Sequence, residues 1–161
     1  MAKKSGKSLL GLHSLLRVAA ALLGVVAFVM MFLDQIEIFL ADSSVGKVAM
    51  DALFGNQDNL IVKNGSAISF VGYILIPAGA ILGLVSLFLF KDKKLDLLFA
   101  VCAGALMIAG AVFVFIMPTV LKDANKTLLN YEFKLLVAPI LAGIFGAAGG
   151  LASIVACAIK K

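Results

Sequence analysis

Four long apolar runs constrain this chain more than any other feature of its sequence. They cover about residues 9–33, 67–90, 97–117 and 135–159. About 20 helical residues cross the roughly 30 Å hydrocarbon core of a bilayer. Backbone amides find no water in lipid, so such a run must close its own hydrogen bonds as a helix. The sequence therefore predicts an all-α integral membrane protein, a four-helix transmembrane bundle in a single domain over 1–161.

Composition agrees with this prediction. Apolar residues make up 63% of the chain and charged residues 14%, against about 45–50% and about 25% in an average soluble domain. The lysines flank the apolar runs instead of forming one basic surface. The net charge of +5 therefore favours a lipid surface over nucleic acid as its partner.

The distribution of lysine predicts the orientation. The N-terminal segment, the link 91–96 and the C-terminus together hold eight lysines and two acids, whereas the loops 34–66 and 118–134 hold five lysines and seven acids. Positive charge marks the cytoplasmic side, so we expect both termini and the link in the cytoplasm of a multi-pass protein of the cell membrane. The first run is then a signal anchor, because its apolar sequence continues unbroken to Leu33.

Small residues recur four apart in two of the runs. Helices in lipid associate through close backbone approach, which small residues permit. We expect these stripes either to pack the bundle or to form an oligomer face. They are Ala138, Ala142, Gly146 and Gly150 in the fourth run, and Gly79 and Gly83 in the second. Pro77 and Pro139 lie in the same two runs, and each predicts a kink.

The larger first outer loop, 34–66, is long for a segment without structure. Ser43 or Ser44 is a candidate cap for a short helix that ends near Gly55. The segments 36–40 and 60–63 are candidates for a small β element.

The second outer loop is shorter. Pro118 ends the third run, and four apolar side chains predict a helical lead into the fourth: Leu128, Leu129, Tyr131 and Phe133. Both outer loops contain a tripeptide that fits the N-glycosylation pattern, Asn64-Gly65-Ser66 and Asn125-Lys126-Thr127.

His13 and Arg17 stand four apart on one face of the first predicted helix. Two interpretations stay open. Either the pair forms a phosphate, lipid-headgroup or proton-handling site within the bilayer, or His13 is interfacial and Arg17 extends to the headgroups. Both residues are thus candidate headgroup contacts.

The runs offer little else for chemistry. No other ionisable side chain is expected inside a run, whereas coupled transport and hydrolysis normally require one. A single histidine excludes paired axial haem ligands and histidine-rich metal sites. Cys102 and Cys157 fit free packing residues. We therefore expect no catalytic residue, cofactor or metal site.

The predicted topology resembles that of tetraspan junction and vesicle proteins such as the claudins. The claudin first loop carries tryptophan and a cysteine pair, whereas this chain has no tryptophan and no cysteine in either outer loop. The resemblance is therefore one of architecture, and no functional residue is carried over.

Together these features favour a non-enzymatic tetraspan that acts by self-assembly or as a small structural or accessory subunit of a membrane complex. Its expected partners are the bilayer and other copies or membrane subunits, and not nucleic acid. The alternative is a channel or transporter component whose pathway lies between protomers.

Overall fold

The computed structural model describes residues 5–59, 61–89, 93–125 and 131–159. Four of its helices are long and apolar enough to cross a membrane, as the four runs predict. They are α1 (Ser5–Val29), which the 3-10 helix η1 (Met30–Phe32) continues, α3 (Ala67–Leu89), α4 (Lys93–Phe115) and α6 (Val137–Ile159). The chain is thus mostly helical and has the makeup of a four-helix membrane protein.

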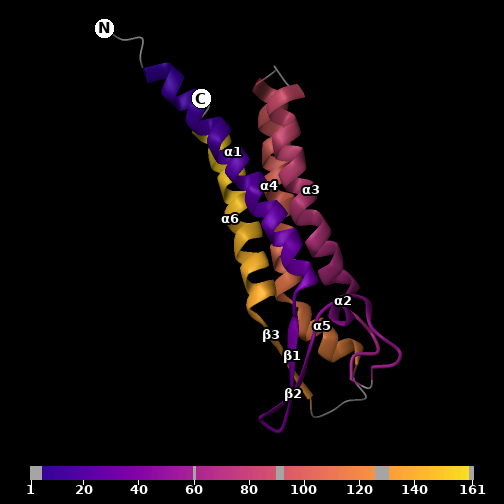
Figure 1. Cartoon of the computed structure of the whole chain (residues 1–161). Helices are drawn as coiled ribbons and strands as arrows, with labels where there is room; N and C mark the ends of the chain where they lie inside the picture. The colour runs from indigo at the N-terminus through magenta and orange to yellow at the C-terminus, as the bar shows by residue number, and fades with distance from the viewer. Residues whose placement is uncertain (1–4, 60, 90–92, 126–130, 160–161) are drawn as a thin grey trace.

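The four long helices form a closed ring. α1 packs against α3 and α6, and α4 packs against the same two helices. The start of α1, the end of α6 and the neighbouring ends of α3 and α4 are at the same end of the bundle (Figure 1). We call this the lysine end, because the sequence segments that flank it carry eight lysines. The opposite end, which carries the strands, is the sheet end.

A three-stranded antiparallel sheet occupies the sheet end. Its strands are β1 (Ile36–Leu40), β2 (Ser43–Val48) and β3 (Tyr131–Leu135), in the order β2-β1-β3. Successive residues of a strand face opposite sides, so Ile36 and Ile38 are buried while Glu37 lies on the other face, opposite Lys47 and Lys134. The short helices α2 (Asp51–Phe54) and α5 (Met117–Ala124) complete this end.

The predicted strand at 36–40 is confirmed, but its predicted partner at 60–63 is wrong. Residues 61–63 are not in a strand, and Leu60 lies outside the described residues. β1 pairs instead with β2 and β3. The two-residue turn at Ala41 and Asp42 places the next six residues directly beside β1, and such short hairpins form readily.

Two predicted helical segments differ from the structure; the first ends near Gly55 as predicted but is much shorter, and the second is wrong. Residues 43–48 form β2, and only Asp51–Phe54 is helical in the segment assigned to a capped helix. The β-branched Val45 and Val48, with Gly46 between them, suit a strand better than a helix. Tyr131 and Phe133 lie in β3, where they alternate with Glu132 and Lys134. Leu128 and Leu129 lie outside the described residues.

The prolines differ in their effect. Pro139 is the third residue of α6, where the missing N–H would have no partner within the helix, so the kink predicted there is wrong. Pro77 lies inside α3, which continues on both sides of it. Pro118 is in the first turn of α5, just after α4 ends at Phe115.

Hydrogen bonds between Asn64 and Asn125 join the segments 34–66 and 118–134. The Asn125 side chain accepts a hydrogen bond from the Asn64 N–H at 3.1 Å and donates to the Asn64 carbonyl at 2.9 Å and the Leu121 carbonyl at 3.0 Å. Asn125 is buried. The amide nitrogen that a glycan would require is therefore used in packing at Asn125; Lys126 and Thr127 of that tripeptide lie outside the described residues.

Candidate functional site

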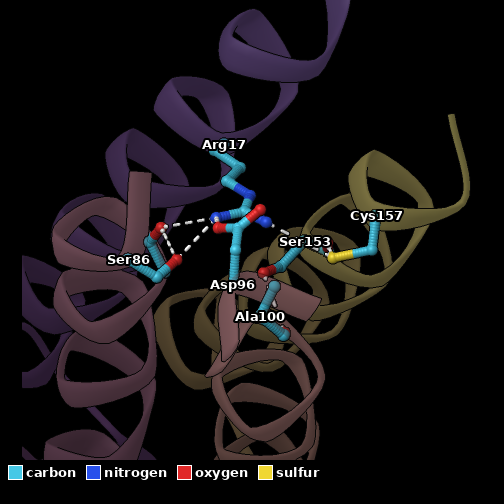
Figure 2. Close-up of polar contacts among 7 residues, drawn as sticks. Arg17, Ser86, Asp96, Ala100, Ser153 and Cys157 are labelled. Carbon is cyan, nitrogen blue, oxygen red and sulfur yellow. Dashed lines mark hydrogen bonds and ion pairs between the residues drawn. The ribbon is translucent and has the colours of Figure 1, made fainter. Parts of the chain in front are cut away.

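A polar cluster around Arg17 lies inside the lysine end of the bundle (Figure 2). Nη1 of Arg17 lies 2.6 Å from Oδ1 of Asp96 and donates to Oγ of Ser86 at 2.5 Å. Nη2 donates to Sγ of Cys157 at 3.4 Å. Arg17 belongs to α1, Ser86 to α3, Asp96 to α4 and Cys157 to α6. One guanidinium group therefore contacts all three of the other long helices.

The two charged residues of this cluster are almost completely buried, which is uncommon for charged side chains. Arg17 and Asp96 are each only 1% exposed. Desolvation of two charges opposes their mutual attraction, so a buried pair contributes little net stability unless further hydrogen bonds satisfy it. Ser86 and the Gly83 carbonyl supply such bonds to Arg17. Asp96 lies in the first turn of α4, where the helix dipole favours a negative charge.

The neighbouring polar side chains mostly bond to backbone. The Ser86 hydroxyl donates to the Gly83 carbonyl at 3.0 Å, and the Ser153 hydroxyl donates to the Ala100 carbonyl at 3.2 Å. His13 is buried one turn before Arg17. Within the described residues, no three His, Cys, Asp or Glu side chains come together as metal ligands would. The cluster therefore contains a buried charged pair, and the contacts of Arg17 connect α1 to α3, α4 and α6.

The structure places Arg17 differently from the interpretation in which its side chain extends to the headgroups. The guanidinium points into the bundle, because Asp96 supplies a counter-charge there. Asp96 was not among the predicted site residues because it falls in the link 91–96, although a lone arginine in an apolar run needs a partner and Asp96 borders the third run. A headgroup contact at His13 or Arg17 stays a prediction.

From Ala20 to Ala27, the buried residues of α1 are all small, a pattern that the sequence-based prediction did not use. The large apolar side chains of α1, such as Leu15 and Leu22, are exposed on the outside of the bundle. Gly24 packs so closely on α3 that an added Cβ would lie 2.5 Å from Cβ of Ala80. The buried residues of α1 between positions 11 and 29 are His13, Arg17, Ala20, Ala21, Gly24 and Ala27.

The six small residues singled out in the second and fourth runs all lie inside the bundle. Ala138 and Ala142 are buried, as are all four glycines. A Cβ on Gly79 would lie 2.6 Å from the Ala103 carbonyl oxygen, and one on Gly150 would lie 2.7 Å from that of Gly104. Gly146 approaches Ile76, and Gly83 approaches Ser153. These stripes pack helices of one chain, so a contact with another subunit would require other residues.

A second buried polar contact lies near the sheet end. The Tyr73 hydroxyl of α3 donates to Oε1 of Gln35 at 2.5 Å. The Gln35 side-chain nitrogen donates to the carbonyls of Met30 and Leu33, which end the first helical segment. The Gln35 backbone bonds to Val48 and Leu136. One neutral side chain thus fixes the sheet to the bundle.

The hairpin of β1 and β2 projects away from the bundle at the sheet end (Figure 1). Its turn residues Ala41 and Asp42 have φ values of 47° and 66°, which side-chain-bearing residues rarely adopt. Leu40 is 38% exposed and Val45, the extra residue of a β-bulge, is 47% exposed. A shallow hollow of about 320 Å³ lies beside the turn, lined by Phe39, Leu40, Ala41, Asp42 and Glu132.

No known family model, curated protein sequence or solved structure matches this chain.

Proposed function

We propose that this chain is a non-enzymatic four-span protein of the cell membrane that acts by association, through the hairpin of β1 and β2. It would assemble with copies of itself or serve as a small subunit of a larger membrane complex. The observation that supports this is the exposed apolar tip of a folded hairpin. Leu40 and Val45 are large exposed apolar side chains of this hairpin, which projects away from the long helices (Figure 1), and burial of apolar surface against a partner favours binding.

The hairpin is prepared for binding because its conformation is already fixed. The sheet is tied to the bundle through Gln35, and a fixed surface loses less entropy when a partner binds. The positive φ angles at Ala41 and Asp42 cost free energy that a looser loop would avoid. Such backbone outliers concentrate at functional sites.

The orientation follows from lysine. With both termini and the link 91–96 on the cytoplasmic side, the hairpin lies on the outer side and its partner is reached from there or laterally. The burial of Asp96 strengthens the asymmetry, because it removes one of the two acids from the surface of the cytoplasmic segments.

The double variant L40D/V45D tests the proposal. Light scattering on particles extracted in mild detergent should show an assembly larger than one chain for the native protein, and a smaller one for the variant. S43D/S44D is the matched control, because it adds the same two charges at exposed positions of the same hairpin. A native protein that is monomeric and carries no other subunit sinks the proposal, as does a variant of unchanged mass.

A channel or transporter component is the second candidate. The buried charges of Arg17 and Asp96 favour it, since ionisable groups inside membrane helices commonly mark pathways or coupled movements. The pathway would lie between protomers, because the interior of one bundle is closed by small residues in close contact. If this candidate is correct, liposomes that contain only this chain should show ion or solute flux. The absence of flux would rule the candidate out.

A further inference from the structure

We propose that Arg17 is a latch that holds α1 in a closed position at the lysine end, and that loss of its contact with Asp96 lets α1 move and uncovers Cys157. This inference concerns the opposite end of the bundle from the hairpin and does not depend on the proposed function. The contacts of Arg17 carry it.

Polar contacts of Arg17 help to hold α1 at the lysine end. Lipid provides no hydrophobic force between helices, so their association depends on close packing and on polar contacts. Close packing is clear further along, where Gly24 meets Ala80. Among the side chains of α1 that the structure describes, those buried on the lysine side of Ala20 are His13 and Arg17. The polar contacts of Arg17 with Ser86, Asp96 and Cys157 therefore contribute to holding this half of α1 against the other three long helices.

The Arg17 side chain has an alternative position, at the lipid headgroups. A long basic side chain near the end of a membrane helix can extend to the headgroups. Leu9, where the apolar run of α1 begins, is eight residues away, which is about 12 Å along a helix. In the closed position Nε of Arg17 is buried and makes no hydrogen bond within the described part of the chain. Without the Asp96 charge, the headgroup position becomes the better one.

Cys157 reports on this movement. Its thiol is buried and in contact with Arg17, so it is covered while the latch is closed. The other cysteine, Cys102, is exposed. A C102S background therefore leaves one thiol, whose reaction with a maleimide in proteoliposomes measures how often the lysine end opens.

The decisive variant is D96N in this background. It keeps the size of the side chain but leaves the Arg17 charge without a partner, which is the costly case for a buried ion pair. We expect Cys157 to react at least about tenfold faster, the change that a shift of about 1.4 kcal/mol in the opening equilibrium produces. D58N, an amide substitution at an exposed aspartate, is the matched control and should react like the parent.

Two further variants separate the latch from ordinary packing. R17M/D96L removes both charges, so nothing draws α1 toward the headgroups and Cys157 should stay protected. R17K keeps the charge but loses the planar fork of donors that reaches three helices, so an intermediate rate is expected even if D96N fails to fold. Equal rates in R17K and the parent, equal rates in D96N and the parent, or a fast rate in R17M/D96L overturn the proposal.

Discussion

The two ends of the bundle are held together by opposite kinds of polar contact. At the lysine end a charged pair, Arg17 and Asp96, connects α1 to the three other long helices. At the sheet end a hydrogen bond between two neutral side chains, Tyr73 and Gln35, connects α3 to the segment that follows η1. Both contacts are buried, and both join α1 or its continuation to α3.

The two contacts differ in the free-energy cost of the unpaired group that remains when each is broken. An unpaired guanidinium inside a bundle is strongly unfavourable and has headgroups to move to. An unpaired amide oxygen costs less and has no comparable alternative. We infer that the sheet end is a fixed support for the hairpin, whereas the lysine end can take two arrangements.

The largest effect is expected when one charge is removed at the lysine end. Asp96→Leu should lower the free energy of unfolding by up to about 3–5 kcal/mol, because Arg17 stays buried and unpaired. Movement of Arg17 to the headgroups would recover part of this loss. Reversible denaturation in mixed micelles measures the change.

The double variant R17M/D96L is the control for that loss. Replacing both members of a buried pair by apolar residues is often neutral or stabilising. The double variant should therefore be at least as stable as the native chain. If it is as unstable as Asp96→Leu, the loss comes from packing around position 96 and not from charge.

A smaller effect is expected at the sheet end. Tyr73→Phe leaves Oε1 of Gln35 without the hydroxyl that it accepts from, at a cost of about 1–3 kcal/mol. Labelling of Cys157 in this variant should match the parent, because the lysine end is untouched. Tyr131→Phe, in the half-buried position of β3, is the matched control. Faster labelling in Tyr73→Phe would show that the two ends are coupled.

The sequence predicts the long helices well because lipid leaves an apolar run of this length one way to satisfy its backbone. Each run and its helix agree to within a few residues; α4, for example, begins at Lys93 and the third run at about residue 97. That small offset hides Asp96, which belongs to the helix although it precedes the apolar run. The helix extends past the apolar boundary because its first turn tolerates an acid.

The sheet end is less predictable because distant pairing decides it. β1 obtains one partner through a two-residue turn and the other from β3, about 95 residues further along the chain. The alternation of Tyr131, Phe133 and Leu135 with charged residues was the available signal for β3. In residues 43–48 the two serines fitted a helix cap while Val45 and Val48 fitted a strand, and pairing with β1 agrees with the strand preference.

The smallest effect is expected at the hairpin turn, and it separates strain from binding. Ala41 has a positive φ, which costs an L-residue about 1–2 kcal/mol, whereas glycine pays about 0.5–1 kcal/mol in chain entropy. Ala41→Gly should therefore stabilise the chain by roughly 0.5–1 kcal/mol in the same denaturation measurement. Asp42→Gly should gain less, because aspartate tolerates this region better than alanine. Leu40 and Val45 stay in place in both variants, so the assembled mass should not change; a loss of stability in Ala41→Gly would mean that the turn carries no strain to relieve.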